Sequence, residues 1–469
     1  MSFSAYFDII SKMKSQVENS AKNSSRGKRI FVGMSGGVDS SVSAALLKAD
    51  GYDATGVFIK VWQPDWMDCN WREDRLDAMR VAAVLDIPFI TLDLEKEYKR
   101  DVVDYMIAEY KAGRTPNPDV MCNKSVKFGA FYDWAMKNGA DFVATGHYSR
   151  IIEGGLRGEE LLEALPGKEV HFRSGKWSEK NKGRKEERKK NEVEASDTSL
   201  GELRGEPSGR ELGLGNRGIV RRENVSDAET FYKLLAGSDP NKDQSYFLWN
   251  IRREQLPHIL FPIGDIEKPE VRKLAKKFKL PNADKKDSQG LCFIGKVDIK
   301  EFLSHYMEPK EGKVLDESGK VIGHHDGAFF LTIGERHSFI IDVKTPHDKP
   351  YFIVSKDIEK NTITVSNKDP QGLLAEAKTL VQLEKTNWMS GIPQIGAMHE
   401  FAKSPSYSGR ARYRQPLEPL VFTSIKEGTI DGRGGTAEVE FSKPQNALTP
   451  GQSLVVYDGE VCLGGGIIV

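Results

Sequence analysis

The chain has 469 residues, of which 39% are hydrophobic, and it carries 68 basic and 68 acidic side chains. This length favours two or three domains, and the composition excludes a wholly disordered chain. The neutral total also excludes a uniformly basic nucleic-acid-binding protein, although a local basic surface stays possible because such surfaces depend on clustering.

Residues 1–28 are predicted to be an N-terminal extension, with apolar side chains at Tyr6, Ile9, Ile10 and Met13. The extension has neither a continuous apolar stretch nor a small-residue cleavage site, so we do not expect a secretory signal. The chain also lacks a run of about 18 apolar residues that would cross a membrane. We therefore expect a cytoplasmic protein without a membrane partner.

Residues 29–150 alternate short apolar runs with longer amphipathic stretches, from "RIFVGM" to "ADFVATGHY". The order is strand, helix, strand, helix, strand, helix, helix, strand, which is typical of a parallel sheet with helices on its faces. We predict an α/β protein whose N-terminal domain, residues 29–240, is a doubly wound parallel-sheet domain that binds a nucleotide.

A charged, glycine-rich insertion interrupts this domain at about residues 153–226. Within it, residues 176–190 hold eight basic and three acidic side chains. The insertion has too few large apolar residues to bury a core, which predicts that most of it is disordered. It is either a solvated loop or a flexible basic arm that helps to hold RNA.

Residues 241–308 return to helical periodicity and are predicted to be a small linking segment. In "EVRKLAKKF", Val271 and Ala275 lie on an apolar face, and the opposite face of Lys and Arg is expected to be solvated. From residue 309 onward, short alternating runs are separated by Gly, Asp-Gly and Asn turns. This pattern predicts a small β-rich domain at 309–375 and a C-terminal β-barrel domain at 376–469.

The motif "SGGVDS", residues 35–40, directly follows the first predicted strand. Its two glycines permit a close approach of the backbone, successive N–H groups can converge on phosphate oxygens, and the next helix contributes its positive N-terminal end. The motif lacks the lysine of the GxxxxGK[ST] loop. We interpret it as a phosphate-binding loop of another type.

The chain has four cysteines, Cys69, Cys122, Cys292 and Cys462, and no CxxC pair. This argues against a structural zinc site and against a disulfide framework. Cys462 lies in an alternating strand pattern and is predicted to be buried. The polar, glycine- or proline-bounded surroundings of Cys122 and Cys292 leave two readings open, a buried small residue or a catalyst.

The loop "SGGVDSS" resembles the pyrophosphate loop of the ATP-pyrophosphatase (PP-loop) superfamily, whose members adenylate a substrate oxygen and expel pyrophosphate. Six further segments resemble, in the same order, segments of the tRNA-specific 2-thiouridylases of bacteria and mitochondria. They span most of the chain outside the extension and the insertion: residues 108–129, 144–150, 241–249, 285–295, 411–416 and 448–468.

The resemblance implies that ATP adenylates O2 of the wobble uridine in tRNA anticodons, and that sulfur then replaces this oxygen to give 2-thiouridine, AMP and pyrophosphate. By similarity, Cys292 carries the sulfur as a persulfide and Cys122 is the nucleophile that releases it. A transient disulfide between Cys122 and Cys292 follows, and a persulfide donor or relay protein must reload Cys292. Asp119 would be the general acid or base, or only a turn residue in "NPD".

For ATP, the resemblance implies contacts in the loop, on the second strand and in "ATGHY": Gly33, Met34, Ser35, Gly36, Gly37, Val38, Asp39, Ser40, Ile59 and Gly146. Asp39 is also expected to hold Mg²⁺ through the phosphates, because this ion prefers oxygen ligands. His147 is either a ligand or catalytic group, or a positional residue.

For tRNA, the resemblance implies contacts at three separate segments: Asn117, Pro118, Asp119, Lys242, Asp243, Gln244, Arg412 and Tyr413. If "GRARYRQP" forms a strand, Arg410, Arg412 and Arg414 lie on one face. Such a face is either a basic stripe for RNA or a solvated strand surface.

The chain departs from the family pattern at Glu335, where Gln is usual, and at His337 and Ser338, where Lys-Gly is usual. Two other functions fit the sequence less well. An amidotransferase or ligase with the same loop would not need Cys122 and Cys292, and a silent RNA-binding protein would not need the loop. An iron-sulfur site that adds Cys69 to these two cysteines has no spacing motif to support it.

Overall fold

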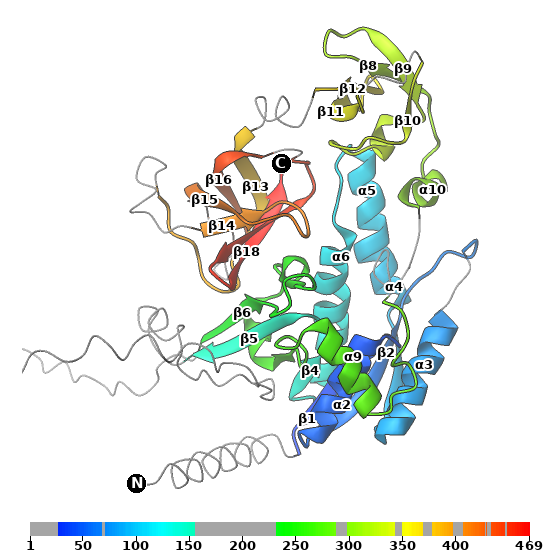
Figure 1. The fold of residues 1–469 in the computed structure, drawn as a ribbon, viewed down its shortest axis with the longest axis vertical. Helices are drawn as coiled ribbons and strands as arrows, with labels where there is room; N and C mark the ends of the chain where they lie inside the picture. The colour runs from blue at the N-terminus through cyan, green and yellow to red at the C-terminus, as the bar shows by residue number, and fades with distance from the viewer. Residues whose placement is uncertain are drawn as a thin grey trace, which may run out of the picture.

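The computed structural model describes residues 27–67, 71–154, 231–287, 298–342, 349–368, 378–396, 407–426, 428, 433–445 and 448–469 (Figure 1). Most of the predicted extension and insertion, together with Cys69 and Cys292, lies outside these residues. None of the described helices is both long and apolar enough to cross a membrane.

The N-terminal domain is built on a parallel sheet with the strand order β3-β2-β1-β4-β7. The strands are β1 (Arg29–Gly33), β2 (Asp53–Lys60), β3 (Phe89–Asp93), β4 (Phe142–Ala144) and β7 (Ile259–Leu260). The central strand β1 is apolar and buried on both faces, as expected for a parallel strand between two helical layers. This confirms the predicted α/β architecture, and β7 shows that the chain after residue 241 completes the sheet.

Helices pack on both faces of this sheet. One layer, with a core that includes Val32, Val42 and Val271, contains α2 (Val38–Ala49), α3 (Trp71–Leu85) and α9 (Lys268–Lys277). The other layer contains α4 (Glu95–Tyr98), α5 (Tyr105–Lys111), α6 (Pro118–Met121) and α7 (Tyr132–Lys137), with π-helical segments Lys99–Asp104 and Cys122–Phe131 between them. The predicted doubly wound arrangement is therefore present.

The central domain is a five-stranded sheet with the order β10-β9-β8-β12-β11, and it follows the short helix α10 (Ile299–Ser304). Its strands are β8 (Gly312–Leu315), β9 (Val321–His325), β10 (Phe339–Ile341), β11 (Phe352–Asp357) and β12 (Thr362–Ser366). Val314, Ile353 and Ile363 lie at its small core.

The C-terminal domain is a barrel that closes through pairing of its first and last strands, β13 and β18. Its strands are β13 (Lys378–Asn387), β14 (Tyr407–Arg410), β15 (Glu418–Lys426), β16 (Arg433–Gln445), β17 (Ser453–Asp458) and β18 (Val461–Ile468). Cys462 is fully buried in β18, as predicted. The boundaries at 240, 308 and 375 stay predictions.

One hairpin joins the first domain to the barrel. The strands β5 (Ser149–Gly154) and β6 (Phe231–Ala236) flank the insertion, pair with each other, and extend the barrel sheet through β18. The core of the α/β domain continues into the barrel, since Trp249 shares a cluster with Val455 and Tyr457. This pair of strands therefore places the barrel beside the carboxyl end of β4 in the parallel sheet.

Candidate active site

The phosphate loop connects β1 to α2 by a sharp turn at two glycines. Gly36 has φ +76°, and a Cβ there would lie 2.3 Å from the carbonyl oxygen of Asp74, so this position requires glycine. Gly37 is the N-cap of α2, and no side chain caps the helix. The first N–H groups of α2 are therefore left for an anion.

Hydrogen bonds hold this loop in one conformation. The Ser35 amide donates to Ser40 Oγ at 3.2 Å, and the hydroxyls of Ser40 and Ser41 donate to the Gly37 carbonyl at 3.1 and 2.8 Å. The side-chain amide of Asn282 donates to Gly36 O and to Ser41 Oγ, both at 2.9 Å. The loop is preorganised, so a phosphate group would not have to order it.

Gly146 follows β4 and lies against the start of α2. A Cβ at this position would be 2.5 Å from the Ser40 amide nitrogen. The side chains of Met34 and Ile59 are 1% and 4% exposed and belong to the cores on opposite faces of the sheet. Contacts of these two residues with a nucleotide would therefore have to use their backbone.

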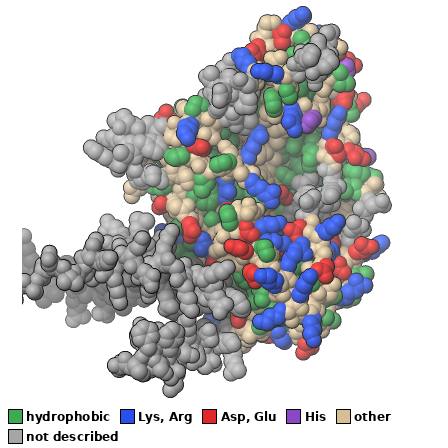
Figure 2. Space-filling model, in the orientation of Figure 1, with side chains coloured by type: hydrophobic (Ala, Val, Ile, Leu, Met, Phe, Trp, Pro, Cys, Tyr) green, Lys and Arg blue, Asp and Glu red, His purple; other side chains and the backbone are tan. Residues whose placement is uncertain are grey.

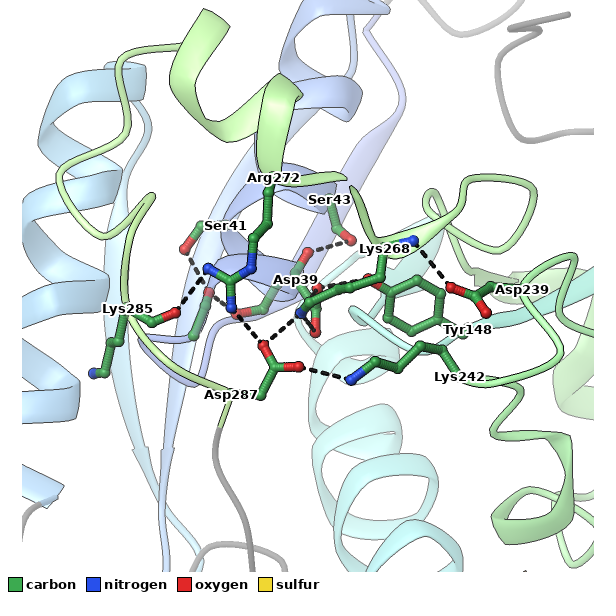
Figure 3. A network of polar contacts seen from close by, with 12 residues as sticks. Asp39, Ser41, Ser43, Tyr148, Asp239, Lys242, Lys268, Arg272, Lys285 and Asp287 are labelled. Atoms are coloured by element: carbon green, nitrogen blue, oxygen red, sulfur yellow. Dashed lines mark hydrogen bonds and ion pairs between the residues drawn. The ribbon is translucent and has the colours of Figure 1, made fainter. Parts of the chain in front are cut away.

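Asp39, in the first turn of α2, is held by two neighbouring partners, Tyr148 and Lys268 (Figure 3). The Tyr148 hydroxyl donates to Asp39 Oδ1 at 2.8 Å, and Lys268 Nζ lies 2.8 Å from both carboxylate oxygens. Burial, followed by the charge of Asp39, raises the pKa of Tyr148. The Asp39 carboxylate, which is the predicted Mg²⁺ contact, is thus engaged by Tyr148 and Lys268 in this structure.

The same lysine reaches a second carboxylate, Asp287, at 2.7 Å. Lys242 and Arg272 also pair with Asp287, at 2.7 and 2.8 Å. Desolvation alone would raise the pKa of Asp287, but the hydrogen bonds from Lys242 and Lys268 outweigh it and lower this pKa to about 2.

His147 is 7% exposed and lies between two polar neighbours. Thr145 Oγ1 is 2.7 Å from its Nδ1, and Lys127 Nζ is 3.4 Å from its Nε2. Burial, and then the Lys127 charge, lowers the pKa of His147 well below its ordinary value, so the ring is neutral at pH 7. Within the described part of the chain, no group of three or more His, Cys, Asp or Glu could hold a metal ion.

The predicted nucleophile Cys122 lies at the end of a short helix with a clear start. Asn117 is the N-cap of α6 and accepts a hydrogen bond from the Val120 amide at 3.2 Å, and Pro118 takes the first helical position. Asp119 follows in the first turn. Cys122 is fully buried, which means that its thiol is shielded from water in this state.

A pocket of about 370 Å³ lies where the three domains meet. It brings together residues predicted from separate segments to contact tRNA: Asn117, Arg412 and Tyr413. The rest of the lining comes from the central domain and the barrel: Thr332, Ile333, Gly334, Glu335 and Gln452. The centroid of the Tyr413 ring lies 4.5 Å from that of the Phe247 ring, so packing fixes the orientation of Tyr413.

Figure 2 shows Lys and Arg side chains at the margin of a hollow between the α/β domain and the β-rich domains.

Comparison with known proteins gives this architecture a family. Three models match successive parts of the chain: the tRNA methyl transferase HUP domain at 28–169 and 219–296, the tRNA methyl transferase PRC-barrel domain at 300–367, and the aminomethyltransferase β-barrel domain at 378–468. A tRNA-specific 2-thiouridylase of Nitrosomonas europaea is 37% identical over 94% of this chain and 98% of its own length. The chain belongs to the tRNA-specific 2-thiouridylase family.

Other members of this family match equally far. The tRNA-specific 2-thiouridylase of Streptococcus thermophilus is 38% identical over 94% of this chain and 95% of its own length. One from Geobacillus kaustophilus is 38% identical over 94% of both chains. An NMN synthetase structure from Francisella tularensis, at 18% identity and a TM-score of 0.19, covers 29% of this chain and 51% of its own, too little to add to the family assignment.

The 242–244 loop of this family member faces partly inward. Asp243 is 6% exposed, forms a buried ion pair with Arg410, and accepts hydrogen bonds from the Gly237 and Ser245 amides at 3.0 Å. Gln244 Oε1 accepts from the Tyr148 amide at 3.0 Å. The Asp243 side chain therefore supports the loop, and among the predicted tRNA residues 242–244 it is the one turned away from solvent.

The predicted stripe of Arg410, Arg412 and Arg414 is wrong. Strand β14 ends at Arg410, which is 8% exposed and donates to the Tyr457 hydroxyl at 2.9 Å. The chain then turns, with Arg414 at φ +63°. Arg412 is exposed and donates to the Ile333 carbonyl at 3.1 Å. The three side chains thus have different surroundings, because a strand face needs extended backbone and this segment lacks it.

Sequence reasoning missed Lys268, Asp287 and Tyr148. Tyr148 and Lys268 meet at Asp39 from distant parts of the chain, and no spacing pattern connects them. The face predicted to be solvated in α9 is exposed at Lys273 and Lys276, whereas Arg272 is only 32% exposed and pairs with Asp287. The sequence offered one hint. The proline after Lys268 in "EKPE" indicates the start of a helix and places Lys268 in its first turn.

Proposed function

We propose that this protein is a tRNA-uridine 2-sulfurtransferase that uses ATP to adenylate O2 of the wobble uridine and then replaces this oxygen with sulfur. One observation carries the proposal. Asn117, at the start of the helix that bears Asp119 and leads into Cys122, lines the same pocket as Arg412 and Tyr413. A uridine in this pocket would lie at the start of the short helix that carries the predicted acid or base and leads to the predicted nucleophile.

The phosphate loop suits the first step. The start of α2 has no side-chain cap, so its first N–H groups can bind the phosphates of ATP. Gly36 and Gly146 allow the backbone to pack closely around this helix start. Transfer of AMP to O2 breaks the bond between the α and β phosphates and releases pyrophosphate. The Asp39 carboxylate would help to hold a Mg²⁺ ion that also binds the phosphates, because this ion prefers oxygen ligands.

The cysteines suit the second step. The Cys122 thiolate attacks Sγ of the Cys292 persulfide, which forms the Cys122–Cys292 disulfide and releases the terminal sulfur as HS⁻. Addition of HS⁻ at C2 and departure of AMP give 2-thiouridine, and Asp119 transfers the proton at the ring. An external thiol reductant must then restore both cysteines, and a persulfide donor must reload Cys292.

We further propose that the tRNA anticodon stem-loop binds along the hollow between the domains. Lys242, Gln244 and Arg412 would contact its backbone, and Tyr413 would stack on an unpaired base. Asp243 would contribute only through its backbone. We place the reaction in the cytoplasm, where thiols are kept reduced.

Reconstitution tests this function. The purified chain is incubated with tRNA, ATP, Mg²⁺, a reductant and a persulfide donor, and the anticodon nucleosides are measured by mass spectrometry. We expect 2-thiouridine with the parent and with the control Cys462→Ala, and none with Cys122→Ser or Cys292→Ser. Full activity in either serine variant would disprove the two-cysteine mechanism.

A further inference from the structure

Lys268 is a largely buried cation that lies beside the phosphate loop. It occupies the first turn of α9, yet its side chain is 11% exposed and its Nζ lies within 2.8 Å of both Asp39 oxygens and 2.7 Å of Asp287 Oδ1 (Figure 3). By contrast, Lys273 and Lys276 of the same helix are 72% and 64% exposed. Only the first of these three lysines is directed to the nucleotide loop.

The position of this ammonium group needs a physical reason. Burying an unpaired charge is costly, so a buried lysine is retained where it has anionic partners. Here the partners are Asp39, in the first turn of α2, and Asp287. The backbone amide of Lys268 is also fixed, by Asp239 Oδ2 at 3.1 Å. The side chain is therefore anchored at its base, and only its ammonium group would have to move to exchange partners.

The loop itself has no cation. "SGGVDS" lacks the lysine that contacts the terminal phosphates in the GxxxxGK[ST] loop, and its only charged residue is Asp39. A triphosphate placed at the N-terminus of α2 would bring several negative charges beside this carboxylate. Backbone N–H groups and one Mg²⁺ would leave part of that charge without a counter-ion.

We propose that Lys268 binds the pyrophosphate portion of ATP, and that on nucleotide binding its Nζ exchanges Asp39 and Asp287 for phosphate oxygens. This rests on the proposed use of ATP at the loop. Release of pyrophosphate returns Lys268 to the two carboxylates, and while it is away Tyr148 still donates to Asp39, and Lys242 and Arg272 still pair with Asp287. Lys268 is thus a leaving-group-binding residue, supplied from α9 in place of a lysine in the loop itself.

Binding of separate fragments tests this role. Affinities for Mg²⁺-pyrophosphate and for AMP are measured by calorimetry for the parent, Lys268→Met, Lys268→Arg and the control Lys273→Met. We expect Lys268→Met to weaken pyrophosphate binding by about tenfold or more, the effect of losing one charge-assisted hydrogen bond, with AMP affinity within about twofold. Lys268→Arg should recover part of the loss, and Lys273→Met should match the parent.

Two outcomes would overturn the proposal. Unchanged pyrophosphate affinity in Lys268→Met would show that the lysine does not bind this group. Equal losses of AMP and pyrophosphate affinity, with a lower melting temperature and no recovery in Lys268→Arg, would show that it only holds α9 in place. If the parent binds pyrophosphate normally but forms no 2-thiouridine, the proposed function fails and the role of Lys268 stands.

Discussion

Gly146 lies directly against Ser40, because a Cβ at Gly146 would come within 2.5 Å of the Ser40 amide nitrogen. The strand that ends at Ala144 and the helix that begins at Val38 therefore meet without a side chain between them. This contact sets the width of the phosphate site.

Replacement of Gly146 by alanine should push the start of α2 away from the end of β4. We expect the free energy of unfolding to fall by about 1–3 kcal/mol, the usual cost of overpacking, and the affinity for ATP to fall with it. Gly33→Ala is the matched control for stability alone, because its added Cβ would meet its nearest neighbour at 3.5 Å, an ordinary contact, while Gly33 is itself a predicted ATP contact. Urea denaturation of both variants and nucleotide titration of Gly146→Ala check this, and a parent-like Gly146→Ala would contradict it.

Arg410 and Arg412 should differ in what they affect. Loss of the Arg410 side chain leaves the buried carboxylate of Asp243 unpaired, so Arg410→Met should cost about 3–5 kcal/mol of unfolding free energy. Arg412→Met removes an exposed charge at the pocket and should preserve stability within about 0.5 kcal/mol while weakening tRNA binding. Denaturant melts and filter binding separate the two effects, and equal stability losses would be inconsistent with this placement.

Asn117 should act both as a helix cap and at the pocket, and two substitutions separate these roles. Asn117→Ala removes the acceptor for the Val120 amide and should cost about 1 kcal/mol of stability. Asn117→Asp keeps a capping oxygen, so it should retain stability but weaken tRNA binding by adding a negative charge to the pocket. Stability loss of the same size in both variants would argue against the cap.

Acid should weaken the network at Asp287. Its folded-state pKa of about 2 lies below the ordinary 3.8, so its ionised form stabilises the fold above about pH 4, and this stabilisation is lost as the pH falls toward 2. We expect the difference in unfolding free energy between the parent and Asp287→Asn to be constant from pH 7 to 5 and to shrink below pH 4. A difference in unfolding free energy that does not change with pH would show that the ionised form of Asp287 does not stabilise the fold.

The sequence pattern predicted those parts of the fold that depend on neighbouring residues in the chain. The alternation of apolar and amphipathic runs from residue 29 to 150 gave the parallel sheet, and the glycines of "SGGVDS" gave the loop. The burial of Arg410 was not predictable, because its partner Asp243 belongs to a distant segment. The same holds for Lys268 and Asp39, whose meeting depends on how α9 packs on α2.

The joining of β5 and β6 to the barrel was missed for a related reason. Each strand is short, and a long insertion separates them in the sequence. Of these two strands only β6 pairs with β18, and it does so at Leu234 and Leu235, whose burial is not revealed by propensity alone.

The central claim is that AMP is attached to O2 of uridine before sulfur replaces it, and the fate of that oxygen tests it most directly. tRNA carrying ¹⁸O at O2 of the wobble uridine is converted with ATP, Mg²⁺ and a persulfide donor, and the products are weighed by mass spectrometry. We predict one ¹⁸O atom in the phosphate of AMP, none in pyrophosphate, and sulfur at C2 of the nucleoside. Label that appears in water or stays in the nucleoside while 2-thiouridine forms would contradict the account.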